Sequence, residues 1–169
     1  MVRNMQSSVV LCLTLLIAAM LQSAALASEF SVLVEAEDMT LASDMVVAAD
    51  GEAFGGRYIH VPVGQDTRSP VALAEIEVSV PADDTYQLWA RLFGPDGNSD
   101  AAYVTVGNAP WSRKWPSTTG VYEWVKIASY DLKKGTHQLK ASHGEIKARF
   151  DAFFLTDDPN GVPPESKPQ

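Results

Sequence analysis

The chain has 169 residues, with 21 acidic and 13 basic side chains and a formal net charge of −8 at neutral pH. This balance disfavours binding to nucleic acid or to an anionic membrane surface, because both ligands carry negative charge. The single cysteine, Cys12, lies in an N-terminal apolar stretch, so no disulfide is expected in the mature domain.

Residues 1–27 have the pattern of a secretory signal peptide. Arg3 provides positive charge ahead of the apolar run Val9–Met20, which is short for a membrane span. Ala25-Leu26-Ala27 matches a small-x-small cleavage signal, so the mature chain is expected to begin at Ser28. We therefore expect a secreted or periplasmic protein that has no membrane anchor after cleavage.

After the cleavage site the sequence alternates between short β-type runs and turn residues, and no useful length has helical periodicity. This pattern is typical of a β-sandwich or a barrel. It predicts a domain over residues 28–157, followed by a tail over residues 158–169 that is rich in proline and charge and has no fixed fold. About nine strands are expected, namely Phe30–Asp38, Met45–Ala49, Arg57–Val61, Ala72–Val80, Thr85–Phe93, Ala102–Val106, Val121–Ser129, Thr136–Ser142 and Ala148–Thr156.

Two connections are longer than simple turns. Gly94–Asp100 contains Asn98, and Gly107–Gly120 contains Trp111 and Trp115. Long loops on a β scaffold often carry binding function, although both could simply join strands. An exposed tryptophan is unfavourable unless something covers it, so Trp111 and Trp115 are candidate ligand contacts.

Period-2 alternation also sorts polar and aromatic side chains onto one face of the sheet. Trp89 and Arg91 share a face of one strand, and Tyr122 and Trp124 share a face of another. Such a surface suits a sugar, whose C–H face stacks on aromatic rings while its hydroxyls bond to polar groups. Two alternatives stay open: the tryptophans pack under a loop or between sheets, and Arg91 forms an ion pair at the edge of the core.

The first and last predicted strands both carry acids in apolar surroundings. Glu35 and Glu37 are two residues apart near the start, and Asp151 lies among phenylalanines near the end. Buried acids are costly without a partner, and Ca²⁺ binds six to eight oxygens, so a cation could satisfy all three with carbonyls near Gly55–Arg57. The alternative is that Glu35 and Glu37 form surface salt bridges.

Signals for catalysis are weak. The three histidines, His60, His137 and His143, have no metal-ligand spacing, and no nucleophile motif is present. A carboxylate pair for glycoside hydrolysis stays open, because acids are plentiful. We therefore expect a protein that is not an enzyme.

Several stretches together carry a family resemblance through their order and spacing. They are Val34–Met39, Gly55–Ile59, Tyr86–Arg91, Gly94–Asp100, Tyr122–Val125, Leu132–Leu139 and Asp151–Pro159. In these the chain resembles carbohydrate-binding modules of the family 6 and family 35 type, which have a galactose-binding-like β-sandwich.

The resemblance implies an all-β, antiparallel β-sandwich of jelly-roll type. It implies that Glu35, Glu37 and Asp151 are ligands of a structural Ca²⁺, and that loop residues Trp111, Trp115 and Asn98 hold a poly- or oligosaccharide. Relatives of this type often carry an acid-acid-Gly turn before the last strand. This chain has His143-Gly144-Glu145-Ile146-Lys147 there, so the resemblance assigns no ligand contact to that loop.

The sequence thus predicts a secreted, non-catalytic carbohydrate-binding module with a structural calcium ion. A first alternative is a protein-interaction module of the same fold at the cell envelope. A second is a small glycan-active enzyme.

Overall fold

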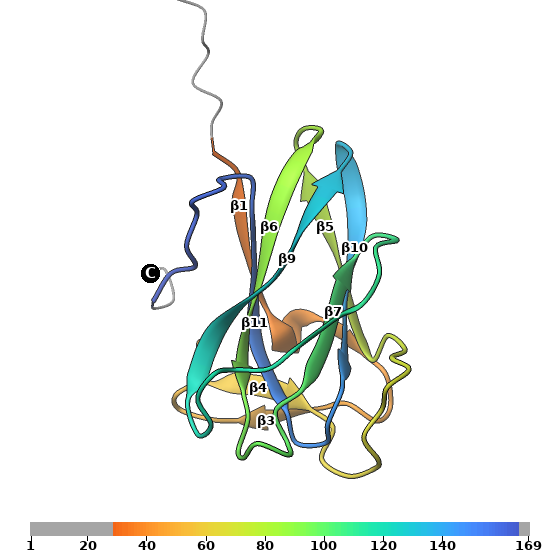
Figure 1. The fold of residues 1–169 in the computed structure, drawn as a ribbon, viewed down its shortest axis with the longest axis vertical. Coiled ribbons are helices and arrows are strands. Elements are labelled where there is room, and N and C mark those ends of the chain that lie inside the picture. The colour runs from red at the N-terminus through yellow and green to blue at the C-terminus, as the bar shows by residue number, and fades with distance from the viewer. Residues whose placement is uncertain (1–28, 166–169) are drawn as a thin grey trace, which may run out of the picture.

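A computed structural model of the chain describes residues 29–165, so the predicted signal peptide lies outside the described residues. Eleven strands in this part of the chain form two antiparallel sheets that face each other (Figure 1). No helix within residues 29–165 combines the length and the hydropathy that a bilayer crossing requires. This arrangement confirms the predicted all-β, antiparallel β-sandwich.

The two sheets, which we call A and B, each mix strands from distant parts of the sequence. Sheet A has the order β3-β4-β11-β6-β9, and β1 pairs with the other half of β11. Its strands are β1 (Ser31–Glu35), β3 (Val46–Ala49), β4 (Arg57–His60), β6 (Asp84–Phe93), β9 (Tyr122–Leu132) and β11 (Arg149–Thr156). Sheet B has the order β2-β5-β10-β7-β8. Its strands are β2 (Thr40–Leu41), β5 (Ala74–Val80), β7 (Ala102–Val106), β8 (Ser112–Lys114) and β10 (Gly135–His143).

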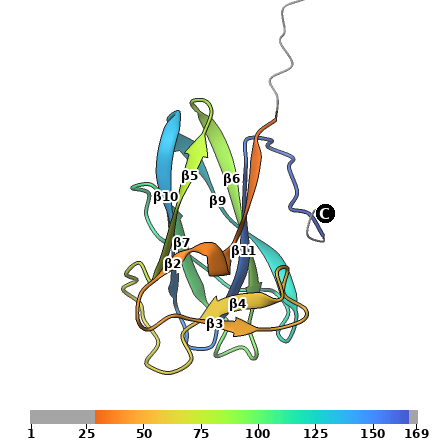
Figure 2. The same cartoon turned by 180° about the vertical axis from the view of Figure 1, so that it is seen from behind.

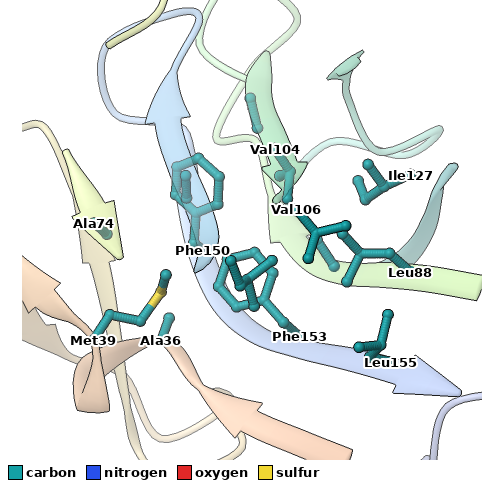
Figure 3. Close-up of a cluster of buried hydrophobic side chains, with 14 of the residues drawn as sticks. Ala36, Met39, Ala74, Leu88, Val104, Val106, Ile127, Phe150, Phe153 and Leu155 are labelled. Carbon is teal, nitrogen blue, oxygen red and sulfur yellow. The ribbon is translucent and has the colours of Figure 1, made fainter. Parts of the chain in front are cut away.

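The core lies between the sheets and is filled by the inward residues of each strand, as alternation predicts. In β6 the buried inward residues are Tyr86, Leu88, Ala90 and Leu92. Figure 3 shows Leu88 beside Phe153 and Leu155 of β11 in this cluster.

A β-bulge in β11 breaks the alternation. The register against β6 shifts between Phe150 and Ala152, so Phe150 and Phe153 both face the core although they are three residues apart. Their rings stack with centroids 6.2 Å apart. Asp151, the residue at the bulge, points to the opposite face of sheet A, where it meets Arg91.

Two local predictions were wrong. The first expected strand runs over Phe30–Asp38, but β1 ends at Glu35 and a 3₁₀ helix covers Ala36–Asp38, so Glu35 and Glu37 are not on one strand. Within the second long connection, β8 adds a strand to the edge of sheet B that the short polar segment Ser112–Lys114 did not indicate.

One end of the sandwich gathers the longer connections, and we call it the loop end. It is the lower end in Figures 1 and 2 and contains the β6–β7, β8–β9 and β10–β11 connections and the β3–β4 loop. Short turns join β5 to β6 and β9 to β10 at the opposite end. The loop end is therefore the part of the fold with most freedom to form a site.

Truncating a core ring tests this packing. We expect Phe150→Ala to lower the free energy of unfolding by about 3–5 kcal/mol, because a fully buried ring is lost and a cavity remains. Urea unfolding followed by circular dichroism measures the change. Val63→Ala, at a residue that is 78% exposed, serves as the control and should leave the unfolding midpoint nearly unchanged. A midpoint for Phe150→Ala equal to that of the control would contradict the assignment of Phe150 to the core.

Candidate functional site

The outer face of sheet A, opposite the core, carries the aromatic and cationic side chains that alternation predicted to lie together. In the register of β6 with β9, Trp89 pairs with Lys126, Arg91 with Trp124, and Phe93 with Tyr122. The structure therefore brings Trp89, Arg91, Tyr122 and Trp124 onto one surface. Their neighbours determine whether this surface is open to a ligand.

Arg91 is held by contacts within the protein. Its guanidinium lies 4.7 Å from the ring centroid of Phe54 and 4.8 Å from that of Tyr122, and it forms an ion pair with Asp151. It also donates to the backbone carbonyl of Glu52 at 3.2 Å. Arg91 therefore fits the alternative of an ion pair at the edge of the core, and its side chain is only 16% exposed.

Asp151, the partner of Arg91 in this ion pair, is fully buried. Its Oδ1 accepts a hydrogen bond from the backbone N–H of Phe54 at 3.0 Å. Burial raises the pKa of Asp151, and the bonds from Arg91 and Phe54 oppose this rise without cancelling it. The carboxylate thus links the central strand of sheet A to the β3–β4 loop.

A second arginine repeats this arrangement nearer the loop end. The guanidinium of Arg149 lies 4.5 Å from the Tyr58 ring centroid and 4.2 Å from that of Phe93. It donates to Asp50 Oδ2 at 2.7 Å, and the Tyr122 hydroxyl donates to the same oxygen at 3.3 Å. Cation–π and ionic contacts within the protein therefore occupy much of the outer face.

Trp124 lies under two chain segments. Its ring meets Phe54 edge-on at 5.7 Å, and its Nε1 donates to the carbonyl of Pro164 at 3.1 Å. Pro164 belongs to the segment after β11, which runs beside β1 in Figures 1 and 2 and is described as far as Glu165. The Trp89 Nε1 atom is buried and has no hydrogen-bond partner among the described residues. Both indoles are thus partly covered.

Trp115 contrasts with these residues. It lies at the loop end, immediately after β8, and is 53% exposed. The guanidinium of Arg113 lies 5.6 Å from its ring centroid. Asn98 is exposed in the β6–β7 connection, and Trp111 is half-buried just before β8. Among the predicted sugar contacts, Trp115 offers the most open aromatic surface.

Glu35 and Glu37 converge on Gly55 of the β3–β4 loop. A Cβ on Gly55 would lie 2.6 Å from Glu37 Oε1 and 3.3 Å from Glu35 Oε2, so a larger residue there would displace these carboxylates. Arg57 Nε lies 3.4 Å from Glu37 Oε1, while Glu37 Oε2 is buried without a hydrogen-bond partner in residues 29–165. Two carboxylates, one of which has a buried oxygen that lacks a hydrogen bond, are a donor set that suits a hard cation.

Asp151 lies near this pair but is already engaged. The negative charge of Glu35 is close enough to contribute to the raised pKa of Asp151. Both Asp151 oxygens already accept hydrogen bonds within the protein, one from the Phe54 N–H and one from Arg91. In the described part of the chain, no group of three or more His, Cys, Asp or Glu side chains is arranged to hold a metal. Glu35 and Glu37 thus meet as a pair at Gly55, and a cation bound by them, with Asp151 as a third ligand, stays a prediction.

Comparison with known proteins connects this geometry to a fold. No protein-family model and no curated protein sequence matches the chain. Among solved structures, a family 35 carbohydrate-binding module from Clostridium thermocellum has a TM-score of 0.57 and 19% identity, over 73% of this chain and 97% of the module. The chain has the fold of a family 35 carbohydrate-binding module. This confirms the resemblance predicted from the sequence.

The same fold occurs within larger enzymes. The Podospora anserina GH26-CBM35 beta-(1,4)-mannanase matches with a TM-score of 0.55 and 18% identity, over 82% of this chain and 30% of the mannanase. An exo-beta-1,3-galactanase from Phanerochaete chrysosporium matches with a TM-score of 0.55 and 16% identity, over 76% of this chain and 29% of that enzyme. The chain thus spans under a third of these enzymes, and at such identities the likeness concerns the fold.

Breaking the Arg91–Asp151 pair tests its role in holding the β3–β4 loop. We expect Asp151→Asn to destabilise the protein by about 3 kcal/mol, because it leaves the arginine without its buried counter-charge. Urea unfolding measures the change. The double variant Arg91→Met/Asp151→Leu should recover part of the loss, because it leaves no unpaired buried charge.

The exposed pair of Lys133 and Asp83 provides the matched control, and Asp83→Asn should leave the midpoint unchanged. Equal effects at Asp83 and Asp151 would contradict a structural role for the buried pair.

Proposed function

We propose that this chain is a non-catalytic carbohydrate-binding domain that holds a poly- or oligosaccharide at its loop end, with Trp115 as the main stacking surface. The observation that carries the proposal is the open indole ring of Trp115, at the loop end of a fold shared with family 35 carbohydrate-binding modules. An indole ring covers the apolar C–H face of a pyranose, and this burial supplies affinity without a charged ligand.

Polar groups around the ring would bond to the sugar hydroxyls. Asn98 is exposed in the neighbouring β6–β7 connection, and its amide can both donate and accept. The backbone of the two connections is joined where the Gly120 N–H donates to the Gly94 carbonyl at 2.8 Å. Trp111 is a further candidate contact. Trp89, Tyr122 and Trp124 would add contacts where their rings are uncovered, whereas Arg91 is held by Phe54, Tyr122 and Asp151.

A non-catalytic role is supported by the contacts of Glu145, the acid that bonds to Arg113 beside Trp115. Its two carboxylate oxygens accept hydrogen bonds from Arg113 and from the backbone N–H groups of Asp100 and Ala101. A glycosidase needs two carboxyls that are open to the scissile bond and about 5–5.5 Å or about 6.5–9.5 Å apart. Glu145 therefore suits a structural link between loops.

A structural Ca²⁺ belongs to the proposal. Glu35 and Glu37 would hold it against Gly55, with backbone oxygens completing the shell and Asp151 as a predicted third carboxylate. The ion would neutralise the two carboxylates and join β1 to the β3–β4 loop. Export to the periplasm or beyond, as residues 1–27 suggest, would bring the protein to glycans outside the cytoplasm.

Carbohydrate binding is tested with the domain over residues 28–165 and insoluble mannan, β-1,3-galactan and α-glucan. We expect wild-type protein to be retained on at least one polysaccharide. Trp115→Ala should weaken retention at least about tenfold, which corresponds to ~1.4 kcal/mol, because the stacking surface is lost. Val121→Ala, an exposed apolar residue of the same connection, is the control and should bind as wild type does. Equal binding by the Trp115→Ala and Val121→Ala variants would place the site elsewhere.

Calcium binding is tested by calorimetric melting with chelator or with added CaCl₂. We expect chelation to lower the melting temperature and calcium to restore it, because a ligand that binds the folded state stabilises it. Glu37→Gln should abolish this response, since it removes charge at the buried oxygen. Glu77→Gln, at an exposed position of β5, should keep the full response. A wild-type melting temperature that is the same under both conditions would refute a structural ion.

A further inference from the structure

Glu145 lies in the β10–β11 connection and bonds to the neighbouring β6–β7 connection. Its Oε2 accepts hydrogen bonds from the backbone N–H groups of Asp100 and Ala101, each at 3.1 Å. In return, the N–H groups of Gly144 and Glu145 both donate to the Ala101 carbonyl, at 2.8 and 3.0 Å. A Cβ on Gly144 would lie 3.0 Å from that carbonyl oxygen, so the close approach of the two connections favours glycine. Glu145 is thus fixed at the loop end by its own backbone.

The second oxygen of Glu145 reaches the segment that carries Trp115. Oε1 accepts a hydrogen bond from Arg113 Nη2 at 2.9 Å, and the Arg113 guanidinium lies beside the Trp115 ring. Burial by itself raises the pKa of Glu145, but the backbone N–H groups of Asp100 and Ala101 and the charge of Arg113 together lower it. The carboxylate therefore stays ionised at neutral pH and holds the guanidinium in place.

Glu123 holds the other side of the β8–β9 connection, and within residues 29–165 it forms no ion pair with Arg113. Its Oε2 accepts from the N–H groups of Ser117 and Thr118 at 2.8 and 3.2 Å, and its Oε1 accepts from the Ser117 hydroxyl at 2.9 Å. Glu123 thus orders the backbone after Trp115, whereas Glu145 acts next to the ring itself. The two acids provide a matched pair for experiment.

We propose that Glu145 is a positioning residue for glycan binding, which orients the Trp115 ring by holding Arg113 beside it before the ligand arrives. This inference rests on the proposed function of Trp115. A half-exposed indole has rotamer freedom that binding must remove, and a side chain that is already ordered avoids that cost. Losing the order of one side chain should weaken binding about 2- to 10-fold.

The experiment observes the ring and the ligand separately. Protein labelled with 5-fluorotryptophan gives one fluorine resonance for each indole, and the Trp115 resonance is identified by its loss in Trp115→Phe. We expect Glu145→Gln to shift the Trp115 resonance towards that of free tryptophan and to narrow it. The dissociation constant for the retained polysaccharide or its oligosaccharide should rise about 2- to 10-fold, with the resonances of Trp89 and Trp124 unchanged.

Arg113→Met is the control for a general loss of order in the loops, because it keeps the hydrogen bonds that the Asp100 and Ala101 N–H groups donate to Glu145. It should reproduce both effects of Glu145→Gln. The double variant should be no worse than either single variant, because both remove the same link. Glu123→Gln combined with Arg113→Met should instead give additive effects, which separates the link through Arg113 from the ordering of the loop backbone.

The outcomes separate the two claims. An unchanged Trp115 resonance in both Glu145→Gln and Arg113→Met overturns the positioning role, whatever the glycan does. Additive effects of Glu145→Gln and Arg113→Met on the dissociation constant also overturn it. A wild-type protein that binds no polysaccharide overturns the proposed function, and with it any role of Glu145 in binding.

Discussion

The burial of Asp151 at the bulge of β11 is the constraint on which the arrangement of the site depends. The bulge lets Phe150 and Phe153 both enter the core, and it turns the one carboxylate of this strand to the outer face of sheet A. A buried carboxylate there needs donors, and the structure supplies them from the Phe54 N–H and from Arg91. The first of these bonds fixes the β3–β4 loop on the sheet.

Fixing that loop brings distant parts of the chain together. It places Gly55 next to Glu35 and Glu37. Glu35 is the last residue of β1 and pairs with Ala152 of β11, so the first and last strands of the domain meet at the proposed ion site. The loop also supplies Phe54, which covers Arg91 and meets Trp124. The same contacts that stabilise sheet A therefore cover much of its outer face, whereas the Trp115 ring at the loop end stays 53% exposed.

Alternation in the sequence was sufficient to predict an all-β sandwich or barrel and the shared face of Trp89, Arg91, Tyr122 and Trp124, because side-chain direction in a strand is a local property. The choice of the sandwich came from the family resemblance. The partners of these residues depend on non-local contacts, which one sequence does not encode in any short pattern. A lone acid among phenylalanines indicated that Asp151 needs a partner but did not single out Arg91. Likewise, nothing near Glu145 in the sequence indicated its contact with Arg113, 32 residues away. Acid spacing suggested a common face for Glu35 and Glu37, yet the 3₁₀ helix brings them together by another route.

The protein uses one contact type, an arginine beside an aromatic ring and bonded to a carboxylate, in two different ways. Arg91 and Arg149 each lie 4.2 to 4.8 Å from the centroids of two rings on the outer face of sheet A, and these contacts serve stability. Arg113 meets a single ring among the described residues, that of Trp115, which remains 53% exposed. An arginine that supports one side of an otherwise open ring leaves the other side for a ligand with an apolar face. The difference between covered and open rings, more than the number of aromatic residues, therefore favours the loop end for the proposed carbohydrate site.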